Sequence, residues 1–196
     1  FVHYRPWVAV LNNLEYDHAD IFPDLAAIET QFHHLVRTVP GNGLVVCPSQ
    51  TESIERVLKR GCWTPVTRFN AQDPAADWSA RIQGATRFEV LGSVGDSNTD
   101  APCQVSWEMS GLHSINNALA VIAAAQGVGV PAAISCKALG SFPGVKRRME
   151  LRGEVAGVRV YDDFAHHPTA VATTLAGAKD VLLDLAARSS TQSELN

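Results

Sequence analysis

The chain has 196 residues and a formal net charge of −4, with 46% hydrophobic and 18% charged residues. This balance is typical of soluble globular proteins, excludes a disordered chain and gives no support to a nucleic-acid partner. The longest apolar run, at 118–125, is shorter than the roughly 20 residues that span a bilayer, so the sequence predicts no membrane segment.

The chain opens on Phe1 rather than Met and lacks the signature of a secretory signal, so we expect a piece of a longer protein. Its four cysteines are Cys47, Cys62, Cys103 and Cys136. They are widely spaced and contain no C-x-x-C pair, which indicates neither a zinc knuckle nor a dense disulfide framework. We therefore expect buried free thiols in a reducing cytoplasm.

The first 69 residues alternate between apolar runs of strand length and segments with apolar residues three and four apart. The predicted elements are a strand at 7–13, a helix at 24–39, a strand at 43–47, a helix at 51–61 and a strand at 64–69. Asp24 is the predicted N-cap of the first helix. This β-α-β-α-β order indicates an α/β fold, with a largely parallel sheet flanked by helices.

The next part predicts strands at 87–92 and within 104–109, paired as an antiparallel hairpin around a turn-rich segment. Helices are expected at 114–127, with Ser114 as N-cap, and at 131–142, with Pro131 in the first turn.

A new unit is predicted to begin near residue 146. Two consecutive strands, at 149–155 and 158–164, precede a long helix from 168 to about 188. We therefore expect a domain boundary between 143 and 148.

The stretch 12–22 places four potential ligands directly behind the first strand, namely Asn13, Glu15, Asp17 and His18. Strand ends of this kind are the usual ligand site in open α/β sheets. His18 is a candidate metal ligand, although Mg²⁺ prefers oxygen atoms and an imidazole suits Mn²⁺ or Zn²⁺ as readily. The other interpretation is a loop-capping role or a contact to a metal ligand.

The stretch 111–120 places Ser114 and Asn117 on one face of a helix's first turn, because the two residues are three apart. Free N–H groups lie at that end, and the Asn amide can both donate to and accept from a purine edge. The simpler interpretation is N-capping by Ser114 with Asn117 solvated.

The stretch 143–153 gathers four basic residues at the predicted domain boundary, namely Lys146, Arg147, Arg148 and Arg152. The planar fork of arginine suits phosphate oxygens. A solvated hinge with surface ion pairs is the alternative.

The stretch 160–169 repeats the pattern of the opening motif, because an apolar strand leads into Asp162, Asp163, His166 and His167 just before a helix with Pro168 in its first turn. Neighbouring side chains of a strand point to opposite faces. At least one Asp and one His are therefore expected to face a cleft.

These four motifs, in this order, resemble those of the Mur ligase superfamily, the ATP-dependent amide-forming enzymes of peptidoglycan metabolism. They look most like the peptidoglycan-recycling branch, which joins UDP-N-acetylmuramate to the murein tripeptide L-alanyl-γ-D-glutamyl-meso-diaminopimelate. The branch that adds L-alanine instead usually has Tyr-Gly where this chain has Phe164 and Ala165. Folylpolyglutamate and cyanophycin synthetases fit 162–169 less well.

The resemblance implies ATP and Mg²⁺ as cofactors, small-molecule substrates and a bacterial, cytoplasmic enzyme. It implies a metal-ligand and catalytic role for His18, a phosphate-contact and catalytic role for Arg148, and a ribose and domain-junction contact for Asp163. It further implies that nucleotide binding involves His113, Ser114, Asn117, His166 and His167.

The resemblance also implies residues 1–146 as a central ATP-binding domain without its phosphate-loop part, and 147–196 as the start of a Rossmann-like, peptide-binding C-terminal domain. The family's phosphate loop belongs upstream of Phe1, so we expect the chain alone to be inactive. The family normally has Asn where this chain has Ser114, which lacks the amide's paired donor and acceptor. A nucleotide-binding domain that has lost catalysis is therefore a competing hypothesis.

Overall fold

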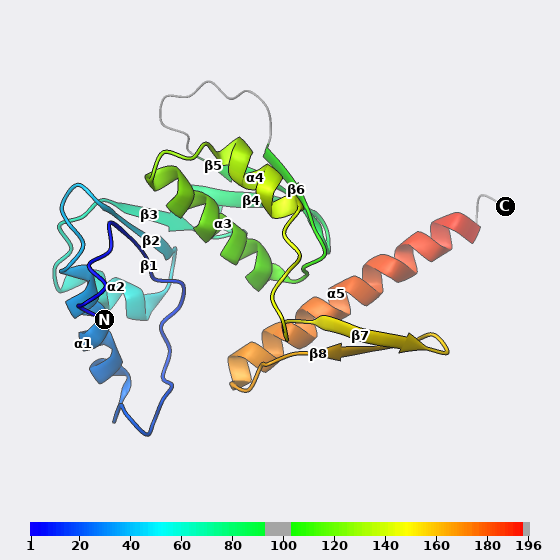
Figure 1. The fold of residues 1–196 in the computed structure, drawn as a ribbon, viewed down its shortest axis with the longest axis horizontal. Coiled ribbons are helices and arrows are strands. Elements are labelled where there is room, and N and C mark those ends of the chain that lie inside the picture. The colour runs from blue at the N-terminus through cyan, green and yellow to red at the C-terminus, as the bar shows by residue number, and fades with distance from the viewer. Residues whose placement is uncertain (93–102, 194–196) are drawn as a thin grey trace.

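Figure 1 shows the chain as a computed structural model, which describes residues 1–92 and 103–193. Six strands form one sheet whose order follows the sequence. They are β1 (Val8–Val10), β2 (Leu44–Pro48), β3 (Val66–Phe69), β4 (Trp78–Gly84), β5 (Arg87–Gly92) and β6 (Cys103–Ser106). The strands β1 to β4 run parallel, while β5 is antiparallel to both of its neighbours. The predicted α/β fold with a largely parallel sheet is confirmed.

Two pairs of helices cover the two faces of this sheet (Figure 1). One pair is α1 (Leu25–Val36) and α2 (Glu52–Lys59), and the other is α3 (Leu112–Gly127) and α4 (Ala132–Gly140). Successive side chains of a strand point to opposite faces. In β2, Val45 and Cys47 therefore join the core beneath α1 and α2, whereas Val46 joins the core beneath α3.

A second, smaller sheet follows, in which β7 (Glu150–Val155) and β8 (Val158–Asp162) pair as an antiparallel hairpin. The helix α5 (Pro168–Ser193) comes next, and Figure 1 shows the hairpin and α5 extending away from the body built on the large sheet. No residue of the hairpin is buried. Among the described helices none has the length and apolar character needed to cross a membrane.

Most of the predicted elements form within a few residues of their predicted ends. The N-cap of α1 is confirmed, because the N–H of Ala27 donates to the Asp24 carboxylate at 2.8 Å. The predicted hairpin at 87–109 is also confirmed as the β5–β6 pair, with its turn at 93–102 outside the described residues. The strand β4 was not predicted, and α5 continues to Ser193, beyond the predicted end near residue 188.

The start of α3 differs from the prediction. The helix begins at Leu112, and its N-cap is Gly111, with φ of 85°, rather than Ser114. The Ser114 hydroxyl donates instead to the carbonyl of Ser110, four residues back, at 2.8 Å. Serine hydroxyls within helices commonly make this backward bond, so the N-cap interpretation of Ser114 is wrong.

The prediction of four free thiols is also wrong. Cys103 and Cys136 form a disulfide that joins β6 to α4, and their Cα atoms lie 6.1 Å apart. The 33-residue separation hides this proximity from the sequence, because it arises only when α4 packs on the edge of the sheet. Cys47 and Cys62 are free, and burial raises the pKa of the Cys47 thiol to about 11.

Candidate functional site

Four segments that are distant in sequence converge where the body built on the large sheet meets the β7–β8 hairpin and α5. They are the loop after β1 (11–18), the first turn of α3 (112–117), the hinge segment before β7 (145–149) and the loop after β8 (163–167). The side-chain amide of Asn12 donates to Asn117 Oδ1 at 2.6 Å, which joins the first two segments. The Phe164 N–H donates to the Arg147 carbonyl at 2.7 Å, which joins the last two.

The Asp163 side chain, in the loop after β8, contacts two residues of the hinge segment. Its Oδ2 accepts from the Met149 N–H at 2.8 Å, and its Oδ1 accepts from the Ala165 N–H at 2.7 Å. The guanidinium of Arg148 lies 3.9 Å from the same carboxylate, whose side chain is 16% exposed. Asp163 therefore holds the hinge segment against the loop after β8.

The backbone of the hinge segment is held in an unusual conformation. Arg147 and Met149 have φ of 58° and 50°, in the left-handed region that side chains other than glycine rarely occupy. Carboxylates hold both amides, because the Arg147 N–H donates to Glu150 at 2.9 Å and the Met149 N–H to Asp163. Conformations of this kind persist only where the surroundings fix them, and they cluster at functional sites.

His113 brings the first turn of α3 to the hinge segment. Burial lowers the pKa of its imidazole; the Asp163 carboxylate opposes this shift and the Arg148 cation adds to it. The ring is consequently neutral at neutral pH, and its buried Nδ1 has no hydrogen-bond partner among the described residues. An orphaned ring nitrogen beside a helix N-terminus fits a ligand that carries both hydrogen-bonding groups and negative charge.

Ser114 and Asn117 have different surroundings, although they lie only three residues apart near the start of α3. Ser114 is 3% exposed, and its hydroxyl is already bonded to Ser110, so it does not point toward a ligand. Asn117 is exposed, and its carbonyl oxygen accepts from Asn12. Of these two candidate nucleotide contacts, Asn117 is the one that lies at the surface of the site.

His18 lies in the exposed loop after β1, with a side chain that is 68% exposed. Its φ is 56°, and its N–H donates to Asp17 Oδ1 at 2.7 Å. This backbone hydrogen bond is the main cause of a lowered pKa for Asp17, and the imidazoles of His18, His167 and His166 contribute. The loop after β1 therefore lies near the loop after β8.

The metal site predicted at His18 is not complete within the described residues. No three His, Cys, Asp or Glu side chains gather there in a way that could hold a metal ion. Mg²⁺ takes six oxygen ligands in near-octahedral geometry, and besides the His18 imidazole the loop offers the Asp17 carboxylate and the Glu15 carboxylate, which is bonded to Asn13 and Thr169. These residues fit one side of a metal ion and do not by themselves form a Mg²⁺ site.

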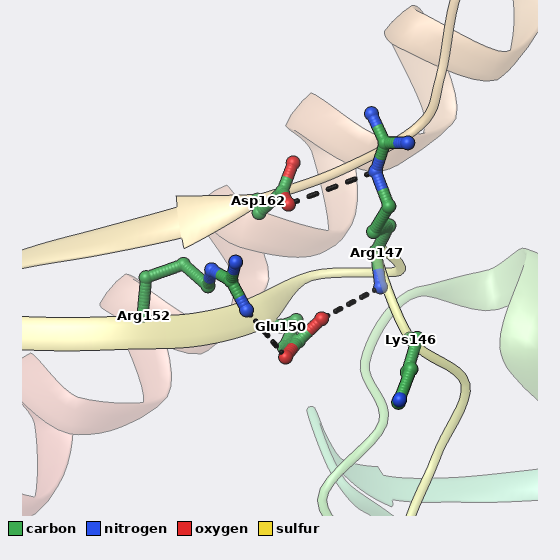
Figure 2. Close-up of a pocket in the computed structure, with 5 residues that line it drawn as sticks. All are labelled: Lys146, Arg147, Glu150, Arg152 and Asp162. Atoms are coloured by element: carbon green, nitrogen blue, oxygen red, sulfur yellow. Dashed lines mark hydrogen bonds and ion pairs between the residues drawn. The ribbon is translucent and has the colours of Figure 1, made fainter.

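A hollow of about 500 Å³ lies beside the hinge segment, and Figure 2 shows its five lining residues. They are Lys146, Arg147, Glu150, Arg152 and Asp162. Two of the cations already have carboxylate partners, since Arg152 lies 2.9 Å from Glu150 and Arg147 lies 3.7 Å from Asp162. The basic cluster therefore contains surface ion pairs, as its alternative interpretation predicts, while Arg148 points to Asp163.

The two histidines of the loop after β8 make different contacts. The ring of His166 packs edge-on against Phe164, with ring centroids 5.1 Å apart, and its Nδ1 lies 3.0 Å from the Phe164 carbonyl. His167 Nδ1 lies 3.7 Å from Glu15 Oε1. The Thr169 hydroxyl donates to Glu15 Oε2 at 2.8 Å, a contact that the sequence did not indicate because 154 residues separate the two.

Two family models match the chain. The Mur ligase middle domain matches residues 2–125, and the Mur ligase glutamate ligase domain matches residues 147–186. The chain is 46% identical over 181 residues to the UDP-N-acetylmuramate–L-alanyl-γ-D-glutamyl-meso-2,6-diaminoheptandioate ligase of Escherichia coli K12, a match that covers 91% of this chain and 38% of that protein. It is 43% identical to the ligase of the same name from Haemophilus influenzae, over 92% of this chain and 38% of the relative.

Solved structures of Mur ligases also resemble this chain. A murein peptide ligase from Psychrobacter arcticus 273-4 superposes with a TM-score of 0.70 and 49% identity, over 93% of this chain and 37% of that one. Relatives named UDP-N-acetylmuramate–L-alanine ligase are more distant, as in Acidothermus cellulolyticus at 39% identity over 88% of this chain and 36% of the relative. The chain spans about 38% of the length of the two ligases from E. coli and H. influenzae.

Proposed function

Since the chain belongs to the Mur ligase family, we propose that it is part of an ATP-dependent ligase of peptidoglycan recycling. In this proposal the whole protein joins UDP-N-acetylmuramate to L-alanyl-γ-D-glutamyl-meso-diaminopimelate. The observation that carries the proposal is the 46% and 43% identity to two relatives named for this activity. The enzyme would act in the bacterial cytoplasm, where both nucleotide substrates are found.

The proposed reaction proceeds in two steps. ATP transfers its γ-phosphoryl group to the muramoyl carboxylate, which gives an acyl phosphate and ADP. The amine of the L-alanyl residue then attacks the acyl carbon, forms the amide bond and releases phosphate. In such phosphoryl transfers the residues of the protein take little part in covalent chemistry, because positioning and charge neutralisation supply most of the rate acceleration.

The residues of this chain would bind and orient the nucleotide in that reaction. The exposed side chain of Asn117 would offer hydrogen-bonding groups for the adenine near the start of α3, close to the unpartnered Nδ1 of His113. Arg148 would offset phosphate charge beside the hinge segment, while Asp163 anchors that segment and contacts the ribose. Mg²⁺ would neutralise charge between the phosphates when bound, with His18 as one of its ligands.

The proposal divides the chain into two domains. Residues 1–146 would belong to the central ATP-binding domain and residues 147–196 to the peptide-binding C-terminal domain. The family-model matches at 2–125 and 147–186 support this division. The acceptor peptide would then bind mainly beyond the residues of this chain.

Phosphate release by the full-length protein tests the proposal. The assay contains UDP-N-acetylmuramate, ATP and Mg²⁺ with either the tripeptide or free L-alanine as acceptor. We expect turnover with the tripeptide and none with L-alanine. Arg148→Ala should lower kcat by roughly 100-fold, the effect of removing one charge-stabilising group from such a site, with unchanged thermal stability. An unchanged kcat would contradict the assigned role of Arg148.

Two other functions remain as outcomes of this assay. Turnover with L-alanine alone would assign the L-alanine ligase activity, for which the relative from A. cellulolyticus is named. A nucleotide-binding domain without catalysis is favoured by one observation, since Ser114 is buried and bonded within its own helix. ADP binding to the full-length protein without phosphate release from either acceptor would establish that function.

A further inference from the structure

Glu15 makes a contact that the proposed catalytic roles do not explain. It lies in the loop after β1, three residues before His18, and both of its carboxylate oxygens have partners. Oε2 accepts from the Thr169 hydroxyl at 2.8 Å. Oε1 accepts from the Asn13 side chain at 3.2 Å and lies 3.7 Å from His167 Nδ1. We call Glu15 with its partners Thr169 and His167 the clasp.

The clasp joins the two parts of the molecule where few other contacts do. Thr169 lies in the first turn of α5, and this helix also comes close to the central body at Gly177. There a side chain would come within 3.1 Å of the Gly111 Cα, so the two backbones pass in contact. Eight residues separate these points, about 12 Å along the helix axis, so together they set the direction of α5.

The candidate nucleotide residues lie beside these two points. His113 follows Gly111 by two residues, and Asp163 and Arg148 act on its pKa. The loop that carries Asp163 leads directly into the clasp, because Thr169 starts the helix that follows this loop. A hydroxyl that donates to a carboxylate makes a charge-assisted hydrogen bond, which is stronger than one between neutral groups.

We infer that Glu15 is a positioning residue. Through the Thr169 hydroxyl it holds the loop after β8 and the start of α5 against the loop that carries His18, and so keeps Asp163 and Arg148 beside His113. Only the part of this role that concerns ATP binding rests on the proposed function. The placement of the loop and of α5 by the clasp is independent of which acceptor the enzyme uses.

Hydrogen exchange on the full-length protein tests the placement without any substrate. Thr169→Val removes the donor and should speed amide exchange in 163–171 about tenfold, the consequence of losing a hydrogen bond to a charged group. Glu15→Gln should act in the same direction, and the double variant should add little to Thr169→Val because both changes break one contact. Thr169→Ser should restore slow exchange.

Thr173→Val is the matched control, since its hydroxyl lies one turn further along α5 and bonds only to the carbonyls of Thr169 and Ala170. It should leave exchange in 163–171 unchanged. Equal exchange rates in wild type and Thr169→Val would overturn the placement. Independent, multiplicative effects of Glu15→Gln and Thr169→Val would overturn the pairing.

Kinetics of the full-length protein test the positioning role. Thr169→Val should raise KM for ATP about tenfold, which corresponds to about 1.4 kcal/mol, while the melting temperature stays unchanged and Thr169→Ser recovers the wild-type KM. A role in stability alone would lower the melting temperature without this change in KM. Faster exchange with an unaltered KM would overturn the positioning role. A failure of the ligase proposal would instead show as absent tripeptide turnover with the exchange result intact.

Discussion

The two parts of the molecule are built in opposite ways. The large sheet buries an apolar cluster on each face, and several of its side chains, such as Phe88 and Val45, are fully buried. The β7–β8 hairpin buries none of its residues, and Val155 remains 75% exposed. Contacts that join the second part to the first include the clasp and the close approach of Gly177 to Gly111.

This difference separates stability from assembly of the site. Burial of apolar surface is the dominant favourable contribution to folding, so the unfolding free energy of the chain should come from the central body. The candidate nucleotide residues lie where the two parts meet, because the Asp163 carboxylate and the Arg148 cation of the second part act on the pKa of His113 in the first. Substitutions in the central body should therefore change stability, and substitutions at the junction should change the site.

The largest expected effect is in the core. Phe88→Ala removes a fully buried ring that packs against Trp107, with ring centroids 5.7 Å apart, and should lower the free energy of unfolding by about 3–5 kcal/mol. Val155→Ala in the exposed hairpin should change it by less than about 0.5 kcal/mol. Urea unfolding of both variants measures the contrast, and similar losses would show that the hairpin carries a core of its own.

Loss of the disulfide should have the second-largest effect on stability. The bond between Cys103 and Cys136 closes a loop across a sequence separation of 33 residues, and such a bond stabilises by about 3.7 kcal/mol through the entropy of the unfolded chain. Reducing agent should lower wild-type stability by about this amount and leave the Cys103→Ala/Cys136→Ala double variant unaffected. A double variant that still responds to reductant would contradict the assignment of this pair.

Substitutions at the junction between the two parts should lower the free energy of unfolding less than the two changes above. Gly111 has φ of 85°, and a Cβ there would come within 2.9 Å of the His113 ring and 3.1 Å of Gly177. Gly129 has a similar φ of 87° with nothing nearby, so Gly129→Ala isolates the backbone strain of about 1 kcal/mol. Gly111→Ala should cost more than this control in thermal unfolding and should also displace α5. Equal losses in the two variants would argue against the Gly111–Gly177 contact.

The sequence predicted the central body better than the junction between the two parts. Alternating and helical apolar patterns located most strands and helices of the central body, because burial on two faces leaves a strong signal, as in β2. The missed strand β4 has only its first two residues buried, so its sequence lacks a clear pattern. Periodicity reports a local environment, and it is informative only where that environment is apolar.

The contacts of the site could be predicted only in part. Motifs placed Asp163, His113 and Arg148 near a nucleotide through resemblance, while their mutual approach depends on how the hairpin sits against α3. The clasp between Glu15 and Thr169 and the disulfide between Cys103 and Cys136 join residues that are distant in sequence. No local pattern encodes such a pairing, since each partner alone is compatible with an ordinary surface or core position.

The smallest expected effect concerns His113, whose pKa lies below its ordinary value because burial disfavours the imidazolium. The unfolded chain therefore binds a proton more readily than the folded one, and stability should fall as the pH drops from the unfolded pKa toward the folded pKa. His113→Gln should weaken this dependence in urea unfolding measured between pH 7 and 5. An identical pH dependence in both proteins would assign the effect to other groups.

NMR titration of the His113 ring tests most directly whether the hinge segment is docked on α3. The Asp163 carboxylate raises the pKa of this imidazole and the Arg148 cation lowers it. We therefore expect a pKa below the ordinary histidine value in the wild-type chain, a lower one in Asp163→Asn and a higher one in Arg148→Ala. A His113 pKa that responds to neither substitution would contradict the assembled site.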